Sequence, residues 1–244
     1  DHRDLHSFPT RRSSDLTITA NLANLTVNNT NAAGVTLSVP LSVSGTLTLT
    51  AGKVITTSAN LLTLGTATAA GTLGTLGTNA YIDGPFARTF AASRTASGTY
   101  SVATLFPVGK GGSYLPIYVD PSTSAGGAVG IRGEAFTSNS GTMGTSVTSL
   151  GTNRWEALAT SGAANITNAY VSLGDAAIVS TNKILQASSA SGSYEALPLS
   201  TVYTPATPNT LATQSSIDGT GYLGYFSYGN LNSCTAPTEI GRAS

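Results

Sequence analysis

The stretch NLTVNNTNAAGVTLSVPLSVSGTLTLTAGKVITTSANLLTLG, residues 24–65, decides the fold of this chain. Leu25 and Val27 are followed 22 positions later by Leu47 and Leu49, with short apolar alternations and Gly, Asn and Ala-Gly corners between the two pairs. A period of about 20 residues with three short strands per turn is typical of a right-handed parallel β-solenoid. A run of antiparallel hairpins is the alternative, because hairpins also produce such alternation.

The coarse repeat extends from residue 17 to about residue 83. A second turn continues through Val54 and Leu64, and a third, degenerate turn, GTLGTLGTNAYID, occupies residues 71–83. Lys53 is the only charged residue between positions 17 and 82. A β-helix polysaccharide-degrading enzyme needs carboxylates or basic residues clustered on one solenoid face. We therefore keep that enzyme class only as a remote alternative.

The pattern changes after Asp83, where aromatic residues become frequent and the alternating segments lengthen. Irregularly spaced strands without a helical stretch predict an antiparallel β-sandwich over 84–231, with Trp155 in its core. The fold class that we expect is all-β: the C-terminal end of a parallel β-solenoid followed by an antiparallel β-sandwich. The strands expected in the sandwich are 86–90, 100–107, 114–119, 128–136, 154–159, 169–173, 184–187, 194–197 and 222–228, with turns at 109–113, 120–127, 138–144 and 188–193.

Charge is sparse in this chain and balanced in sign. Eleven basic and eleven acidic residues give a formal net charge of 0, and only 9% of all residues are charged. Binding to nucleic acid or to an anionic membrane surface needs a basic patch, so we expect neither partner. No apolar run approaches the ~20 residues of a membrane-spanning helix. We therefore expect no membrane span in this fragment.

Both ends of the chain resemble translated sequencing adapter. DHRDLHSFPTRRSSDL (residues 1–16) back-translates into a standard short-read adapter, and EIGRAS (residues 239–244) back-translates into part of its reverse complement. We expect the first segment to be disordered, and we leave both segments out of fold reasoning. Because the only histidines, His2 and His6, lie in the first segment, a Ser-His-Asp triad is not expected.

Four segments of the remaining chain recur in this order in a known family. They are YIDGPFARTF (81–90), LFPVGKGGSYLPIYV (105–119), GTNRWEAL (151–158) and GYFSYG (224–229). The chain resembles the repetitive β-helix/β-sandwich modules of large secreted cell-surface proteins from Bacteroidetes-type bacteria. SCTAPT, which contains the lone Cys234, resembles the linker to a following module. We accordingly expect a linker at 232–238.

This resemblance implies a non-catalytic, adhesin-like or stalk-like segment that is extracellular or held at the cell surface. Members of the family often end in a type IX secretion sorting domain. The implied partners are neighbouring modules of the same chain and, as a further option, extracellular glycans or host and cell surfaces. The family has no defined catalytic residues to carry over, so we expect no enzyme activity and no cofactor. We also expect no metal, because histidine is absent outside the first segment, cysteine is single and the acidic residues are isolated.

The aromatic segment YLGYFSY, residues 222–228, is the one candidate binding surface. Tyrosine rings stack on sugar rings in carbohydrate-binding modules, so such a module using Tyr222, Tyr225 and Tyr228 is the alternative function. Alternation places Tyr222, Phe226 and Tyr228 on one strand face and Tyr225 on the other. A closing strand of the sandwich gives the same pattern.

The other candidate motifs favour structural roles. In Gly109-Lys110-Gly111-Gly112 a glycine follows the lysine and no helix is expected afterwards, so the motif predicts a tight hairpin rather than a phosphate loop. The acidic residues are isolated in sequence, mostly beside Gly or Pro. Asp120 and Asp175 are at most single ligands for calcium, which needs several converging oxygens. A carboxylate pair for hydrolysis could be assembled only across strands.

Overall fold

A computed structural model describes residues 21–78, 80–199, 201–213, 217 and 221–232. The two adapter-like segments, 1–16 and 239–244, lie outside the described residues, and so does Cys234. Within the described residues nearly all regular structure is β-strand, with one short 3-10 turn, η1, at Ala163–Asn165. The all-β prediction is confirmed.

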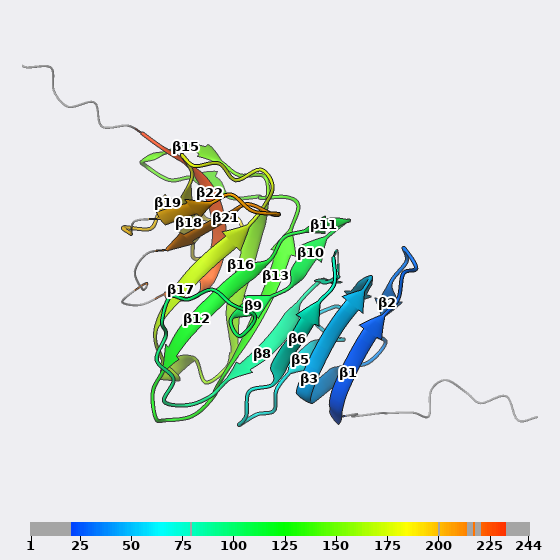
Figure 1. Cartoon of the computed structure of the whole chain (residues 1–244). Helices are drawn as coiled ribbons and strands as arrows, with labels where there is room; N and C mark the ends of the chain where they lie inside the picture. The colour runs from blue at the N-terminus through cyan, green and yellow to red at the C-terminus, as the bar shows by residue number, and fades with distance from the viewer. Residues whose placement is uncertain (1–20, 79, 200, 214–216, 218–220, 233–244) are drawn as a thin grey trace, which may run out of the picture.

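The first part of the chain forms stacked parallel coils. Leu25 lies opposite Leu47 and Val27 opposite Leu49, so the 22-residue sequence spacing is the pairing register of β1 with β3. Strand β3 then pairs in parallel with β5 and β6, and β5 with β8. Figure 1 shows these strands as a row from blue to teal. The parallel solenoid is confirmed and the hairpin alternative is wrong. The strands are β1 (Asn21–Asn28), β2 (Val35–Thr36), β3 (Leu41–Ala51), β4 (Lys53–Ile55), β5 (Leu62–Leu64), β6 (Thr72–Leu76), β7 (Tyr81–Asp83) and β8 (Phe86–Phe90).

A second, five-stranded sheet closes the coils and is called the solenoid sheet below. Its strand order is β11-β10-β7-β4-β2, with β10 at Val108–Lys110 and β11 at Ser113–Tyr114. Val54, Ile82 and Val108 stand in register on neighbouring strands and are buried. Such apolar ladders form the interior of a solenoid, because every coil places its inward side chain above the previous one. The sharp corner between β3 and β4 uses Gly52, whose φ is +78° and whose Cβ, if present, would lie 1.7 Å from the Asn29 carbonyl oxygen.

Strand β8 joins the parallel coils to the antiparallel part. One of its edges pairs in parallel with β5, and the other pairs antiparallel with β13. Both parts therefore share one 12-stranded sheet, the main sheet, whose order is β1-β3-β5-β8-β13-β16-β22-β18-β19-β14 with β6 and β15 attached beside this path. Residue 83, the last residue of the expected solenoid part, ends β7, and β10 and β11, which follow it in the sequence, also belong to the solenoid sheet. The added strands are β13 (Val129–Phe136), β14 (Thr142–Met143), β15 (Val147–Leu150), β16 (Arg154–Ser161), β18 (Lys183–Ala187), β19 (Ser193–Ala196) and β22 (Gly224–Leu231).

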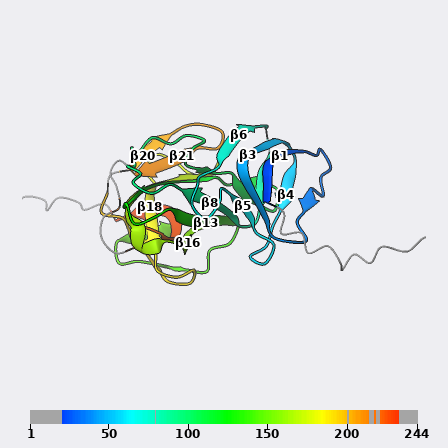
Figure 2. The same cartoon turned by 90° about the horizontal axis from the view of Figure 1, so that it is seen from below.

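A third sheet packs on the antiparallel part of the main sheet. This cover sheet has the order β20-β21-β17-β12-β9, and Figure 2 separates β20 and β21 from β13 and β16 of the main sheet. Trp155 is fully buried between the layers, and its indole N–H donates to the Leu115 carbonyl at 2.9 Å. The predicted sandwich with Trp155 in its core is confirmed. The strands are β9 (Leu105–Phe106), β12 (Ile117–Thr123), β17 (Ile166–Gly174), β20 (Thr201–Thr204) and β21 (Thr210–Thr213).

Two local predictions were wrong. The turn expected at 120–127 starts too early, because Asp120 and Pro121 lie inside β12, opposite Tyr170 and Ala169 of β17. The strand expected at 100–107 shrinks to β9, because residues 91–104 run as a loop tied to the cover sheet by side-chain hydrogen bonds. One of them runs from the Tyr100 hydroxyl to the Thr213 carbonyl at 2.9 Å.

Candidate functional site

The three candidate tyrosines do not share one exposed face. Tyr228 points into the core, is 6% exposed, and has its ring centroid 6.2 Å from that of Trp155. Tyr222, which precedes β22, is half-buried against the same core. Tyr225 points to the opposite side of the main sheet and packs beside Tyr194 and Leu185. The alternation predicted for Tyr225 and Tyr228 is thus observed: Tyr228 is buried, whereas Tyr222 and Tyr225 are partly exposed.

A shallow hollow of about 530 Å³ adjoins Tyr225. Its wall includes the polar side chains Gln186, Ser193 and Glu195. The Gln186 amide nitrogen is held by the carbonyls of Gly221 and Leu223, at 2.5 and 3.2 Å, so it has no freedom to turn toward a ligand. An aromatic ring beside a few hydroxyl and carboxylate groups is the usual composition of a polar small-molecule site.

The two aspartates considered as calcium ligands are engaged within the protein. Asp175 accepts from the Asn153 amide at 2.6 Å, from the Tyr228 hydroxyl at 3.0 Å and from the Ala177 backbone N–H at 3.0 Å. Burial, followed by the charge of Asp175, raises the pKa of Tyr228 above its usual range. Among the residues that the structure describes, no three His, Cys, Asp or Glu side chains converge as a metal site.

Asp120 fastens the loop 91–104 to the cover sheet. Its side chain is fully buried, forms an ion pair with Arg94, and accepts from the backbone N–H groups of Ser97 and Gly98, both at 2.9 Å. Arg94 also donates to the Pro121 carbonyl. An aspartate beside proline usually bonds its own backbone, and this expectation is wrong here because the carboxylate bonds a segment more than twenty residues earlier in the chain.

A carboxylate pair does form across strands, on the outer face of the main sheet. Glu134 on β13 lies directly opposite Glu156 on β16. Burial, followed by the charge of Glu156, raises the pKa of Glu134, against the effect of three nearby cations. Glu156 is 6% exposed and forms an ion pair with Arg132, and the Arg154 guanidinium lies 3.7 Å from the ring centroid of Phe136. A hydrolytic carboxylate must contact its substrate, and the burial of Glu156 favours a structural charge network instead.

The Gly-Lys-Gly-Gly motif forms the hairpin between β10 and β11, as predicted. Lys110 pairs with Ser113, and the turn residues Gly111 and Gly112 have φ angles of +58° and +95°. Two consecutive positive φ angles are the signature of a type I′ hairpin turn, which favours glycine. The Lys110 ammonium lies 3.4 Å from a carboxylate oxygen of Asp83, so the lysine forms an ion pair with a residue of the neighbouring strand β7.

Among the described residues, no further strand pairs with the β1 and β2 edge of the coil stack, and this edge is uncharged. Strand β1 ends the main sheet and β2 ends the solenoid sheet. Neither strand contains a charged residue or a proline, and Val35 and Val39 beside this edge are each 37% exposed. Proteins usually protect such edges with lysine, proline or a covering segment, because open backbone groups pair with other strands. The edge from Asn21 to Val39 is therefore a surface suited to strand addition.

Comparisons of the chain with protein-family models, with curated proteins and with solved structures gave no match. The stacked coils are consistent with the β-helix module that the sequence resembles. Within the described residues, no helix is long and apolar enough to cross a membrane.

Proposed function

We propose that this chain is a non-catalytic, adhesin-like structural segment of a large extracellular surface protein. The observation that carries the proposal is the continuous main sheet, whose last strand on this side among the described residues is the uncharged β1. A ladder of backbone hydrogen bonds running through coils and sandwich makes a stiff body, and the edge accepts a neighbouring β-module of the same kind. The sparse charge of the chain, at 9% of residues, suits a spacer that presents other modules.

A lysine at the open edge should block this association. In the proposed arrangement wild-type protein self-associates through β1 at high concentration. Thr26→Lys should raise the dissociation constant of this self-association at least about tenfold, which weakens the association free energy by ~1.4 kcal/mol. Thr26 is exposed on β1. Sedimentation velocity over a concentration series measures the effect.

Thr160→Lys is the matched control, because Thr160 is equally exposed but lies on β16, an interior strand of the main sheet. Its association should equal that of the wild type. A wild type that stays monomeric at every concentration, or an equal effect of both lysines, would refute the edge as the association surface.

Carbohydrate binding at Tyr225 is a second candidate, favoured by the hollow that this ring shares with Ser193 and Glu195. On this hypothesis Tyr225→Ala weakens binding to soluble oligosaccharides at least about tenfold. Tyr225→Phe keeps the ring and should retain most of the affinity. Affinity electrophoresis in gels containing individual polysaccharides measures both variants. Equal retardation of wild type and Tyr225→Ala in every gel would rule the hypothesis out.

A further inference from the structure

A positively charged side chain interrupts an apolar row of the core. Arg88 on β8 lies in register between Leu64 on β5 and Ile131 on β13, and Val43 on β3 continues the row. The three apolar side chains are fully buried, and Arg88 is only 4% exposed. Burial of a guanidinium is strongly unfavourable without a counter-charge. The position therefore calls for an explanation beyond packing.

The protein supplies Arg88 with neutral acceptors but with no ion pair among the described residues. Its Nη1 donates to the carbonyls of Val102 at 2.9 Å and Leu105 at 2.5 Å. The carboxylate of Asp120 is already bound by Arg94. Burial, and next the charge of Arg94, lower the pKa of Arg88 to about 10, so the guanidinium is still protonated at neutral pH. Among the described residues, carbonyl groups and the rings of Phe90 and Phe106 face this charge, but no carboxylate balances it.

The other edge of this guanidinium has no protein partner among the described residues, and Arg88 lines a cavity together with Phe90 and Leu73. Nε and Nη2 of Arg88 donate to no described protein atom. Neither atom is among the fully buried polar atoms that lack a partner, so both remain accessible to solvent. The cavity that Arg88 lines has a volume of about 280 Å³. Nε–H and Nη2–H lie on the same edge of an arginine and match the two oxygens of one carboxylate.

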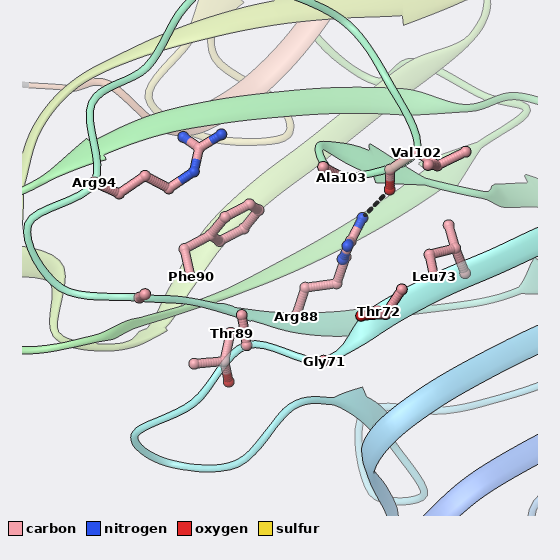
Figure 3. A pocket seen from close by; sticks show the side chains of 11 residues that line it. Gly71, Thr72, Leu73, Arg88, Thr89, Phe90, Arg94, Val102 and Ala103 are labelled. Carbon is pink, nitrogen blue, oxygen red and sulfur yellow. Dashed lines mark hydrogen bonds between the residues drawn. The ribbon is translucent and has the colours of Figure 1, made fainter.

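The remaining walls are largely apolar and are held in place. Leu73 of β6, Phe90 of β8 and Val102 of the loop line the cavity, and Figure 3 shows the Phe90 ring between the two guanidinium groups of Arg88 and Arg94. The centre of the Arg88 guanidinium lies 5.9 Å from the Phe90 ring centroid. Because Asp120 fastens the loop, the cavity is formed before any ligand enters, as is usual for small-molecule sites.

We propose that this cavity binds a small monocarboxylate, whose two oxygens accept from Nε and Nη2 of Arg88. The body of the ligand, a short apolar chain or a single sugar ring, lies against Phe90 and Leu73. Arg88 supplies the charge, and the cavity volume of about 280 Å³ limits the ligand to about the size of a single sugar ring. This site lies away from the edge at β1 and from Tyr225, so it stands independently of the function proposed above.

Titration of the full chain with butyrate and with glucuronate, at constant ionic strength and neutral pH, tests the site and distinguishes an aliphatic acid from an acidic sugar. The Arg88 Nε–H resonance in nitrogen–proton correlation spectra should shift as at least one of the two probes is added. The shift should saturate as expected for one binding site. Sulfate serves as the control anion, and it should bind at least tenfold more weakly, because it has no apolar body to lie against Phe90 and Leu73 and its double charge is costly to remove from water.

Arg88→Lys should weaken carboxylate binding at least tenfold, because an ammonium group lacks the two parallel N–H donors that bind both carboxylate oxygens. Arg88→Met should abolish saturable binding, whereas Lys183→Met on β18, outside the cavity, should bind as the wild type does. If Arg88→Met does not fold, the thermal midpoint of the wild type provides the second readout, since carboxylate but not chloride should raise it. Absence of saturation by both carboxylates, equal binding of sulfate, or unchanged binding by Arg88→Lys would overturn the proposal.

Discussion

Trp155→Ala should destabilise the fold by about 4 kcal/mol, the usual range for removing a buried large aromatic side chain. The indole is fully buried between the main and cover sheets, and it packs on Tyr228. The substitution leaves a cavity. It also removes the indole N–H that donates to the Leu115 carbonyl. Urea unfolding followed by far-ultraviolet circular dichroism measures the loss, because the variant lacks the only tryptophan.

Two further variants separate volume from hydrogen bonding. Trp155→Phe keeps an aromatic ring but loses the N–H donor, so it should cost about half as much as Trp155→Ala. Met143→Ala, at a side chain that is 54% exposed, should change the free energy of unfolding by less than about 0.5 kcal/mol. A loss below ~1.5 kcal/mol for Trp155→Ala would show that the two layers are not held together at this residue.

Asp120→Ala should cost about 3–5 kcal/mol, because it breaks a buried ion pair from one side. Arg94 loses its counter-charge, and the backbone N–H groups of Ser97 and Gly98 lose their acceptor. The loop 91–104 should then open before the rest of the protein does. Chemical denaturation gives the global loss, and limited trypsin digestion gives the local one, since cleavage after Arg94 requires a loosened loop.

Asp120→Asn is the informative companion variant. Its amide oxygen can still accept from Ser97 and Gly98, so only the ionic part of the network is lost and the effect should be clearly smaller. Trypsin should cleave Asp120→Ala after Arg94 under conditions in which the wild type is resistant. Equal resistance of Asp120→Ala and wild type would show that the loop is held by its other contacts, such as Tyr100 on Thr213.

The coils could be predicted from sequence because apolar side chains that repeat at a fixed spacing indicate which residues of neighbouring coils pair. Leu25 and Leu47 are equivalent inward positions, and stacking them aligns the flanking strands automatically. The same alternation locates β8, where the predicted strand 86–90 agrees with the structure. Phe86, Arg88 and Phe90 also alternate in the sequence, and this spacing indicates that Arg88 lies on the same strand face as the two phenylalanines.

The polar contacts between distant segments could not be predicted. Glu134 and Glu156 meet only because β13 and β16 pair in one particular register, and a shift by one residue would place both side chains on the opposite face. Asp120 read as a turn residue because its neighbour is Pro121, whereas the fold uses its carboxylate to hold a remote loop. Strands β20 and β21 were missed because short Thr- and Ala-containing segments resemble linkers.

The change of strand direction at β8 has a consequence for how such a protein can vary in length. On the β1 side, insertion or deletion of one whole coil would move the end of the molecule by one strand spacing, about 4.8 Å, without altering the sandwich. Duplications that are not a full coil would have to bulge out as loops. On the β13 side, β13 and β16 are each paired with specific antiparallel partners, so the same duplication would disrupt the core. Such a protein can therefore lengthen only on the β1 side, and only by whole coils.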